Sequence, residues 1–154
     1  MCGIFGYVGY RNASEIAIKG LKRLEYRGYD SAGFAILNDK LEIRKNVGTI
    51  DFVVEKEKVY EVVGNIAIAH TRWATHGKVS KENAHPHIDC KNEIAIVHNG
   101  IIENYYELKN ELISKGHILK SECDSEIIAH LIEEELKEKD FVLACKNAFS
   151  KLKG

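Results

Sequence analysis

Short apolar or alternating runs, separated by amphipathic stretches, are the feature of this 154-residue chain that most restricts its fold. Each run has the length of a strand, and none approaches the roughly 20 apolar residues needed to cross a bilayer. The pattern therefore predicts buried strands and no membrane span. The strands are expected at Ile4–Val8, Ala32–Leu37, Leu41–Lys45, Ile66–Ala69 and Ile94–Val97.

Helical spacing of apolar residues fills the rest of the chain. The first such segment follows Asn12, which forms a plausible capping box with Glu15. Strands layered with helices indicate an α+β or αβ sandwich, and the composition marks no internal domain boundary. Helices are expected over Ala13–Leu24, Phe52–Val63, Tyr105–Leu112, Ile128–Leu136 and Phe141–Leu152.

The charge balance argues against nucleic acid or lipid as the ligand. Lysine and arginine number 22 against 23 acidic residues, a formal net charge of -1, so no basic field is present to attract polyanions. The four cysteines are scattered without a C-x-x-C pair, and no secretion signal precedes them. We therefore expect a cytoplasmic protein that has free thiols and binds a small molecule.

Cys2 is the first candidate for chemistry. Removal of Met1 is favoured by a small second side chain and would make Cys2 the terminal residue. The α-amine, with a reference pKa of about 7.7–8.0, can then take the thiol proton and return it to a departing nitrogen. Cys2 alone would equally fit a small buried residue, so its context decides.

Asn99-Gly100 follows a predicted strand and is the candidate oxyanion hole. The asparagine amide and the glycine N–H can donate to a tetrahedral oxyanion. Asn-Gly is also the preferred dipeptide of a tight hairpin turn. Against the turn, the residues after Gly100 have helical spacing rather than the pattern of a returning strand.

The segment His70–Gly77 concentrates polar side chains directly after a predicted strand. Arg72 is suited to clamp a carboxylate, although the segment also fits a polar loop with Trp73 folded onto the core. Asp124 precedes an apolar helical pattern and suits an N-cap, or it could hold a substrate ammonium.

His85, His87 and Cys90 are close in the sequence and carry side chains that could bind a metal. Their spacing fits a zinc site poorly, because Pro86 separates the histidines and no second paired cluster follows. No phosphate-binding glycine motif occurs. We therefore expect neither a metal nor a cofactor.

Five motifs in order resemble class II glutamine amidotransferases of the N-terminal-nucleophile hydrolase superfamily. The start of the chain is shared across that class, whereas the second and third motifs resemble the glutaminase domain of the glutamine:fructose-6-phosphate aminotransferase (isomerizing) family. The motifs are Met1–Gly6, Leu24–Gly33, His70–Gly77, Asn83–His87 and Val97–Asn104.

The resemblance implies a reaction and a role for each candidate residue. Glutamine would be hydrolysed through a thioester on Cys2, and the ammonia would serve the formation of glucosamine 6-phosphate from fructose 6-phosphate. The implied roles are Cys2 as nucleophile and base, Asn99 and Gly100 as oxyanion hole, Arg72 with Thr75 and His76 on the glutamine α-carboxylate, Asp124 on the ammonium, Arg27 near the nucleophile, and Trp73 at the start of a glutamine loop.

The resemblance also implies parts that this chain lacks. Residues 2–154 would form a type 2 amidotransferase domain, an αββα sandwich incomplete at its C-terminal end, and the sugar isomerase domain would be absent or separate. If the protein forms a homodimer, we expect the missing regions to make the contact. The alternatives are another class II amidotransferase and a catalytically silent glutamine-binding module that needs a partner.

Overall fold

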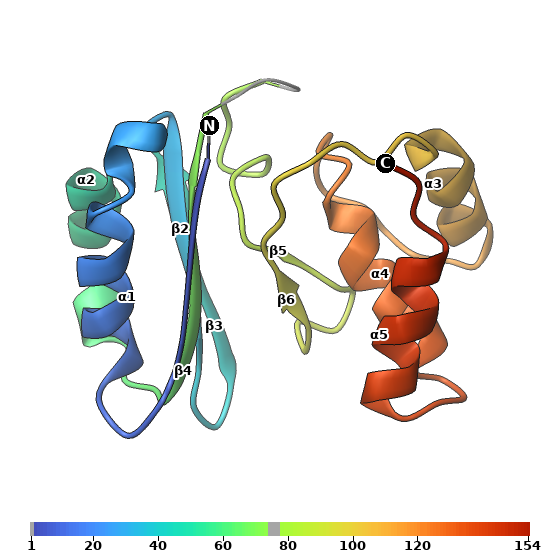
Figure 1. Ribbon diagram of the computed structural model, residues 1–154, viewed down its shortest axis with the longest axis horizontal. Coiled ribbons are helices and arrows are strands. Elements are labelled where there is room, and N and C mark those ends of the chain that lie inside the picture. The colour runs from blue at the N-terminus through green and yellow to red at the C-terminus, as the bar shows by residue number, and fades with distance from the viewer. Residues whose placement is uncertain (1, 74–77) are drawn as a thin grey trace. The chain divides into compact units, whose positions relative to one another are not determined.

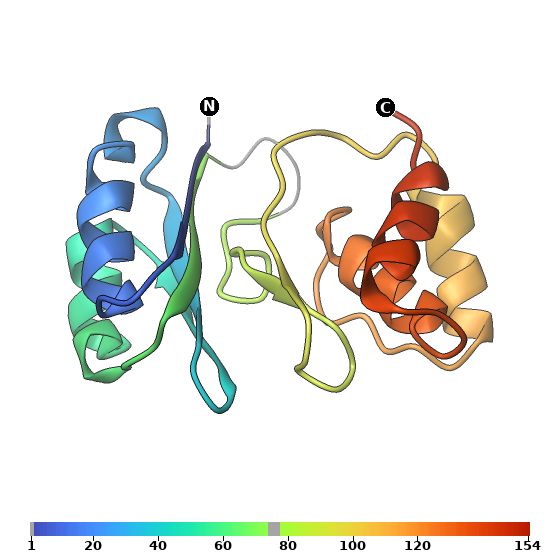
Figure 2. The same ribbon diagram turned by 60° about the horizontal axis from the view of Figure 1, so that its bottom comes forward.

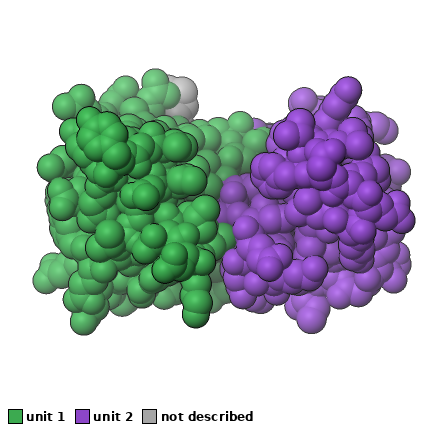
Figure 3. Space-filling view, turned by 90° about the horizontal axis from the view of Figure 1, so that it is seen from below, with its two compact units in different colours: residues 1–86, 97–99 green, residues 87–96, 100–154 purple. Residues whose placement is uncertain are grey.

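The computed structural model of the chain describes residues 2–73 and 78–154. They form two compact units, which Figure 3 shows in different colours. Unit 1 runs to Pro86 and includes Val97–Asn99, and unit 2 comprises His87–Ile96 and Gly100–Gly154. The composition of the sequence does not mark this division.

Unit 1 is built on an antiparallel sheet of four strands in the order β1-β4-β2-β3. The pairing of Gly3 with Thr71 brings the start of the first strand to the end of the last. All four expected strands in this part of the chain are therefore confirmed. They are β1 (Gly3–Val8), β2 (Ser31–Leu37), β3 (Leu41–Val47) and β4 (Ile66–Arg72).

Two helices, α1 (Ala13–Lys22) and α2 (Ile50–Lys56), cover one face of this sheet (Figures 1 and 2). Asn12 caps α1 by accepting a hydrogen bond from the Ser14 N–H. The role of Asn12 in the predicted capping box is therefore confirmed. The apolar core of this unit includes Ala17, Ile18, Leu21, Phe34, Ile36, Ile50, Val53 and Ala69.

The expected helix over Phe52–Val63 is wrong in length. Helix α2 ends at Lys56, and Lys58 takes the left-handed conformation with φ 53°, which a continuous right-handed helix does not allow. A short 3₁₀ turn, η2 (Val59–Glu61), follows it.

Unit 2 combines a small hairpin with three helices. Strands β5 (His87–Ile88) and β6 (Ala95–Ile96) pair antiparallel. Their turn is organised by Asp89, whose carboxylate accepts hydrogen bonds from the Glu93 and Ile94 N–H groups. The helices are α3 (Tyr105–Ser114), α4 (Glu126–Glu135) and α5 (Phe141–Ser150).

The helices of unit 2 pack through one apolar cluster that includes Leu112, Ile127, Leu131, Ala144 and Ala148. The three helices expected here are confirmed, whereas the strand expected over Ile94–Val97 is shorter and β5 was not predicted. Among the described residues, no helix is long and apolar enough to cross a membrane.

Candidate active site around the N-terminal cysteine

The β1–β4 ladder brings Cys2 beside Trp73. The residue before Gly3 and the residue after Arg72 lie next to each other because the two strands are antiparallel. The Cys2 Sγ accepts a hydrogen bond from the Trp73 N–H at 3.2 Å. The same thiol lies 3.7 Å from the Trp73 carbonyl oxygen, to which it can donate, so the Trp73 backbone holds the sulfur in place.

Gly3 allows this close approach. Its N–H donates to Thr71 Oγ1 at 3.1 Å. A Cβ at this position would lie 2.7 Å from the Leu24 Cβ and 2.9 Å from Thr71 Oγ1, closer than real Cβ contacts. The glycine after Cys2 is therefore required by packing.

Asn99 lies beside Cys2. Its Nδ2 donates to the Cys2 carbonyl oxygen at 3.1 Å, and its Oδ1 lies 2.8 Å from His70 Nε2. The first contact leaves the second amide hydrogen of Asn99 for another acceptor. No strand returns after Gly100, and the hairpin turn lies between β5 and β6 instead. The hairpin interpretation of Asn99-Gly100 is therefore wrong.

His70 orients the Asn99 amide. Burial lowers the pKa of His70 to about 4, and the nearby Arg72 guanidinium also lowers it, whereas the hydrogen bond to Asn99 acts in the opposite direction. The imidazole is therefore neutral near pH 7. Because Oδ1 accepts only, Nε2 carries the proton, and the amide must point Nδ2 toward Cys2.

Sequence reasoning included His70 in a dense polar segment but gave it no role. It stands two residues before Arg72, and side chains two apart on a strand share a face. That spacing was the signal available for finding it.

Arg72 is the last residue of β4, and Trp73 follows it directly. Arg72 is buried, and its Nη1 donates to the Lys78 carbonyl at 3.3 Å. The Trp73 side chain is 43% exposed, with its ring edge-on to Tyr29 at a centroid distance of 5.5 Å. The interpretation of Trp73 as folded onto the core is therefore wrong. Thr75 and His76 lie outside the described residues.

Arg27 ends a 3₁₀ turn, η1 (Glu25–Arg27), that reaches the same region. The next residue, Gly28, packs so tightly on β4 that a Cβ there would lie 2.9 Å from the Trp73 nitrogen. Arg27 itself donates from Nε to the Tyr26 hydroxyl at 3.2 Å. Arg27 is thus the neighbour in sequence of Gly28, which packs against the Trp73 backbone that contacts Cys2.

Gly100 and Asp124 belong to unit 2. Asp124 Oδ2 accepts a hydrogen bond from the Ile102 N–H at 2.8 Å. The N-cap of α4 is Ser125, and no side chain donates or accepts a cap hydrogen bond there. The expectation that Asp124 caps the helix is therefore wrong, because its carboxylate is engaged by the backbone after Gly100.

An α+β fold with a cysteine at its N-terminal strand and an oriented amide beside it is the arrangement of an N-terminal-nucleophile hydrolase. The sequence profile described as "Glutamine amidotransferase domain" matches residues 70–154, and the chain belongs to this family.

Two curated relatives carry the same name, glutamine–fructose-6-phosphate aminotransferase (isomerizing). The protein of Methanococcus maripaludis is 56% identical over 160 residues, which cover 100% of this chain and 27% of the relative. That of Thermococcus kodakarensis is 56% identical over 156 residues, covering 100% of this chain and 26% of the relative. The chain thus spans about a quarter of the length of these relatives.

Solved structures agree with the expected fold. Glutamine phosphoribosylpyrophosphate amidotransferase from B. subtilis, complexed with ADP and GMP, is 33% identical with a TM-score of 0.85, covering 100% of this chain and 33% of that one. A structure titled as the allosteric regulatory enzyme of purine biosynthesis is also 33% identical, with a TM-score of 0.87. The expected α+β, N-terminal-nucleophile hydrolase fold is confirmed.

Proposed function

We propose that this chain is the glutaminase part of an enzyme that forms glucosamine 6-phosphate from fructose 6-phosphate. Its reaction is the hydrolysis of L-glutamine to glutamate and ammonia. The observation that carries this proposal is the convergence of Trp73 N–H on the Cys2 sulfur and of Asn99 Nδ2 on the Cys2 carbonyl. The names of the relatives supply the sugar substrate.

Cys2 acts as nucleophile and as its own base once Met1 has been removed. The α-amine takes the thiol proton, and the sulfur attacks the side-chain carboxamide carbon of glutamine. The tetrahedral intermediate collapses, the amine gives its proton to the leaving nitrogen, and ammonia departs. Water then cleaves the γ-glutamyl thioester to release glutamate and the free thiol.

The oxyanion formed on attack needs donors placed in advance. Asn99 offers its Nδ2, held in orientation by His70. The Gly100 N–H is the second donor. Because the His70 ring is neutral, it positions the amide without placing a positive charge beside the α-amine.

The glutamine backbone groups are bound by charge complementarity. Arg72, with Thr75 and His76, holds the α-carboxylate, and Asp124 holds the α-ammonium. Trp73 and Arg27 border the same substrate. The burial of Arg72 supports its role, since a buried guanidinium keeps a fixed direction.

The remaining steps belong to other parts of the enzyme. Residues 2–154 form the amidotransferase domain, and a sugar isomerase domain or chain that binds fructose 6-phosphate receives the ammonia. The length of the relatives supports such a further part. The free cysteines of the chain suit a reducing cytoplasm.

The test combines mass spectrometry of the purified chain with trapping of Cys2. We expect loss of Met1, labelling of Cys2 by a glutamine-analogue electrophile, protection by glutamine, and ammonia release that Cys2→Ala abolishes. Cys145→Ala, which removes a half-buried free thiol on α5, is the matched control and should change neither readout. Ammonia release that survives Cys2→Ala would contradict the mechanism, and glutamine binding to an inert Cys2 would favour the silent module.

A further inference from the structure

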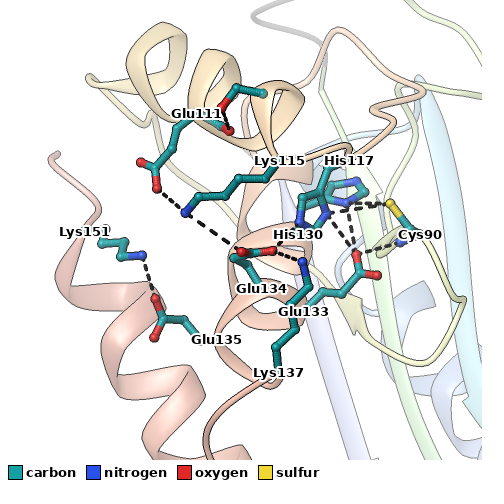
Figure 4. A network of polar contacts seen from close by, with 11 residues as sticks. Cys90, Glu111, Lys115, His117, His130, Glu133, Glu134, Glu135, Lys137 and Lys151 are labelled. Atoms are coloured by element: carbon teal, nitrogen blue, oxygen red, sulfur yellow. Dashed lines mark hydrogen bonds and ion pairs between the residues drawn. The ribbon is translucent and has the colours of Figure 1, made fainter.

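A cluster of four potential metal ligands lies in unit 2, outside the proposed active site (Figure 4). Cys90 comes from the β5–β6 turn, His117 follows α3, and His130 and Glu133 stand one turn apart on α4. One ligand atom from each of the four lies within 4.8 Å of the other three.

The separations fit four-coordinate zinc. Cys90 Sγ lies 3.7 Å from His117 Nδ1 and 3.5 Å from His130 Nδ1. Glu133 Oε2 lies 3.1 Å from the first nitrogen and 3.5 Å from the second. With Zn–S near 2.3 Å and Zn–N or Zn–O near 2.0–2.1 Å, tetrahedral angles separate neighbouring ligand atoms by roughly 3.3–3.6 Å.

The outer contacts match those of a metal-bound histidine. His117 Nε2 lies 2.9 Å from Glu134 Oε2, on the side of the ring opposite the cluster. The Cys90 N–H donates to Glu133 Oε2 at 3.1 Å. A carboxylate on the far nitrogen is the usual partner of a zinc-binding imidazole, because it fixes the tautomer and the ring direction.

The surroundings of His117 also argue for a cation in the cluster. Both of its ring nitrogens face carboxylate oxygens, from Glu133 and Glu134. A neutral imidazole has one N–H and cannot satisfy both. With a metal on Nδ1, the remaining proton on Nε2 donates to Glu134, and both ring nitrogens of His117 have a partner. The competing arrangement is an imidazolium between the two carboxylates.

We propose that Cys90, His117, His130 and Glu133 bind one zinc ion. The site is closed, with four protein ligands and no open position, so its role is structural. The ion would join the β5–β6 turn, the segment after α3, and α4 within the small unit 2. The two histidines and Glu133 are already buried in one place.

The cluster is not apparent from the sequence, because its members are far apart along the chain. The histidines lie 27 and 40 residues beyond Cys90. The sequence groups Cys90 with its neighbours His85 and His87, whereas the fold places it beside residues 27 to 43 positions further along the chain. Helical spacing does link His130 and Glu133, which are three residues apart and share a face.

Metal uptake by the full chain tests the proposal. The Cys2→Ala background should be used, because a terminal cysteine chelates metal through its amine and thiol. We expect one equivalent of zinc in competition with a chromophoric chelator. Cobalt should give the intense visible bands of a tetrahedral site and a near-ultraviolet thiolate charge-transfer band. Cys90→Ser should abolish that band, and Cys145→Ser should leave it unchanged.

A second pair of variants tests the outer contact. Glu134→Gln should weaken zinc affinity by about 10–100-fold, whereas Glu138→Gln, an exposed residue just beyond α4, should not. Circular dichroism of each metal-free variant shows whether it has folded. Zinc uptake that is substoichiometric, or that Cys90→Ser leaves unchanged, would overturn the proposal and favour the imidazolium arrangement.

Discussion

His70 Nε2 lies 2.8 Å from Asn99 Oδ1, joining two residues that are 29 positions apart. The contact links the end of β4 to the segment after β6, and both belong to unit 1. It fixes which end of the Asn99 amide faces Cys2.

Asn99→Ala should reduce the turnover number for ammonia release from glutamine by about 10²–10³-fold, the usual effect of losing one oxyanion donor. Steady-state ammonia assays measure it. Asn110→Ala, which removes an exposed asparagine on α3, is the matched control. A loss confined to KM would show that Asn99 binds substrate rather than the oxyanion.

His70→Gln should retain much of the activity. The side-chain amide nitrogen introduced at position 70 can donate to Asn99 Oδ1, as the imidazole Nε2 does. His70→Leu cannot donate and should lower the turnover number more than it changes KM. Comparing the two variants in the same ammonia assay isolates the hydrogen bond from the loss of the ring. Equal losses in both would indicate that the ring itself, and not its donor, is needed.

The depressed pKa of His70, about 4, makes unit 1 sensitive to acid. Between pH 6.5 and about 4 the unfolded chain binds a proton that the folded chain does not, so stability falls as pH falls. The slope from this residue is about 1.4 kcal/mol per pH unit. Urea unfolding followed by the fluorescence of Trp73 measures it, and His70→Gln should lose this contribution.

Gly33→Ala should destabilise unit 1 by about 1–3 kcal/mol, as overpacking does. A Cβ at Gly33 would collide with the His85 carbonyl oxygen and would lie 2.6 Å from the Lys45 Cβ. Gly6→Ala, also within a strand, meets no atom within 4 Å and should be neutral or slightly stabilising. Equal free energies of unfolding for the two variants would refute the packing argument.

Glu135→Gln should weaken the contact between α4 and α5 by about 1–3 kcal/mol at neutral pH. Hydrogen bonds from Lys139, Lys151 and Asn147 lower the pKa of this carboxyl to about 2. Its contribution is therefore present above about pH 4.5 and is lost as pH falls toward 2. The difference in unfolding free energy between wild type and variant, followed by far-ultraviolet circular dichroism, should shrink over that range.

The spacing of apolar residues along the chain predicted the strands and most helices. Within one strand or helix, this spacing decides which side chains are buried. It failed at Lys58, where the left-handed backbone that ends α2 leaves no mark in the apolar pattern. It also missed β5, since a two-residue strand is too short to show alternation. Pairing across the hairpin, organised by Asp89, defines that strand instead.

Cys2 and Asn99 could be proposed as nucleophile and oxyanion donor from residue type and order along the chain. Their supporting contacts could not, because these are set by register between distant segments. The Trp73 N–H reaches the Cys2 sulfur only through the β1–β4 ladder, and His70 meets Asn99 only after the segment beyond β6 joins unit 1. Asp124 was misjudged for the same reason, since its partner Ile102 lies 22 residues earlier.

The pairing of Gly3 with Thr71 sets a delay during synthesis. These partners are 68 residues apart, so at roughly 5–20 residues per second the ribosome needs about 3–14 s to deliver the second after the first. Until then β1 has no strand to join. The proposed removal of Met1 would therefore have those seconds to occur before the first strand is enclosed in the sheet.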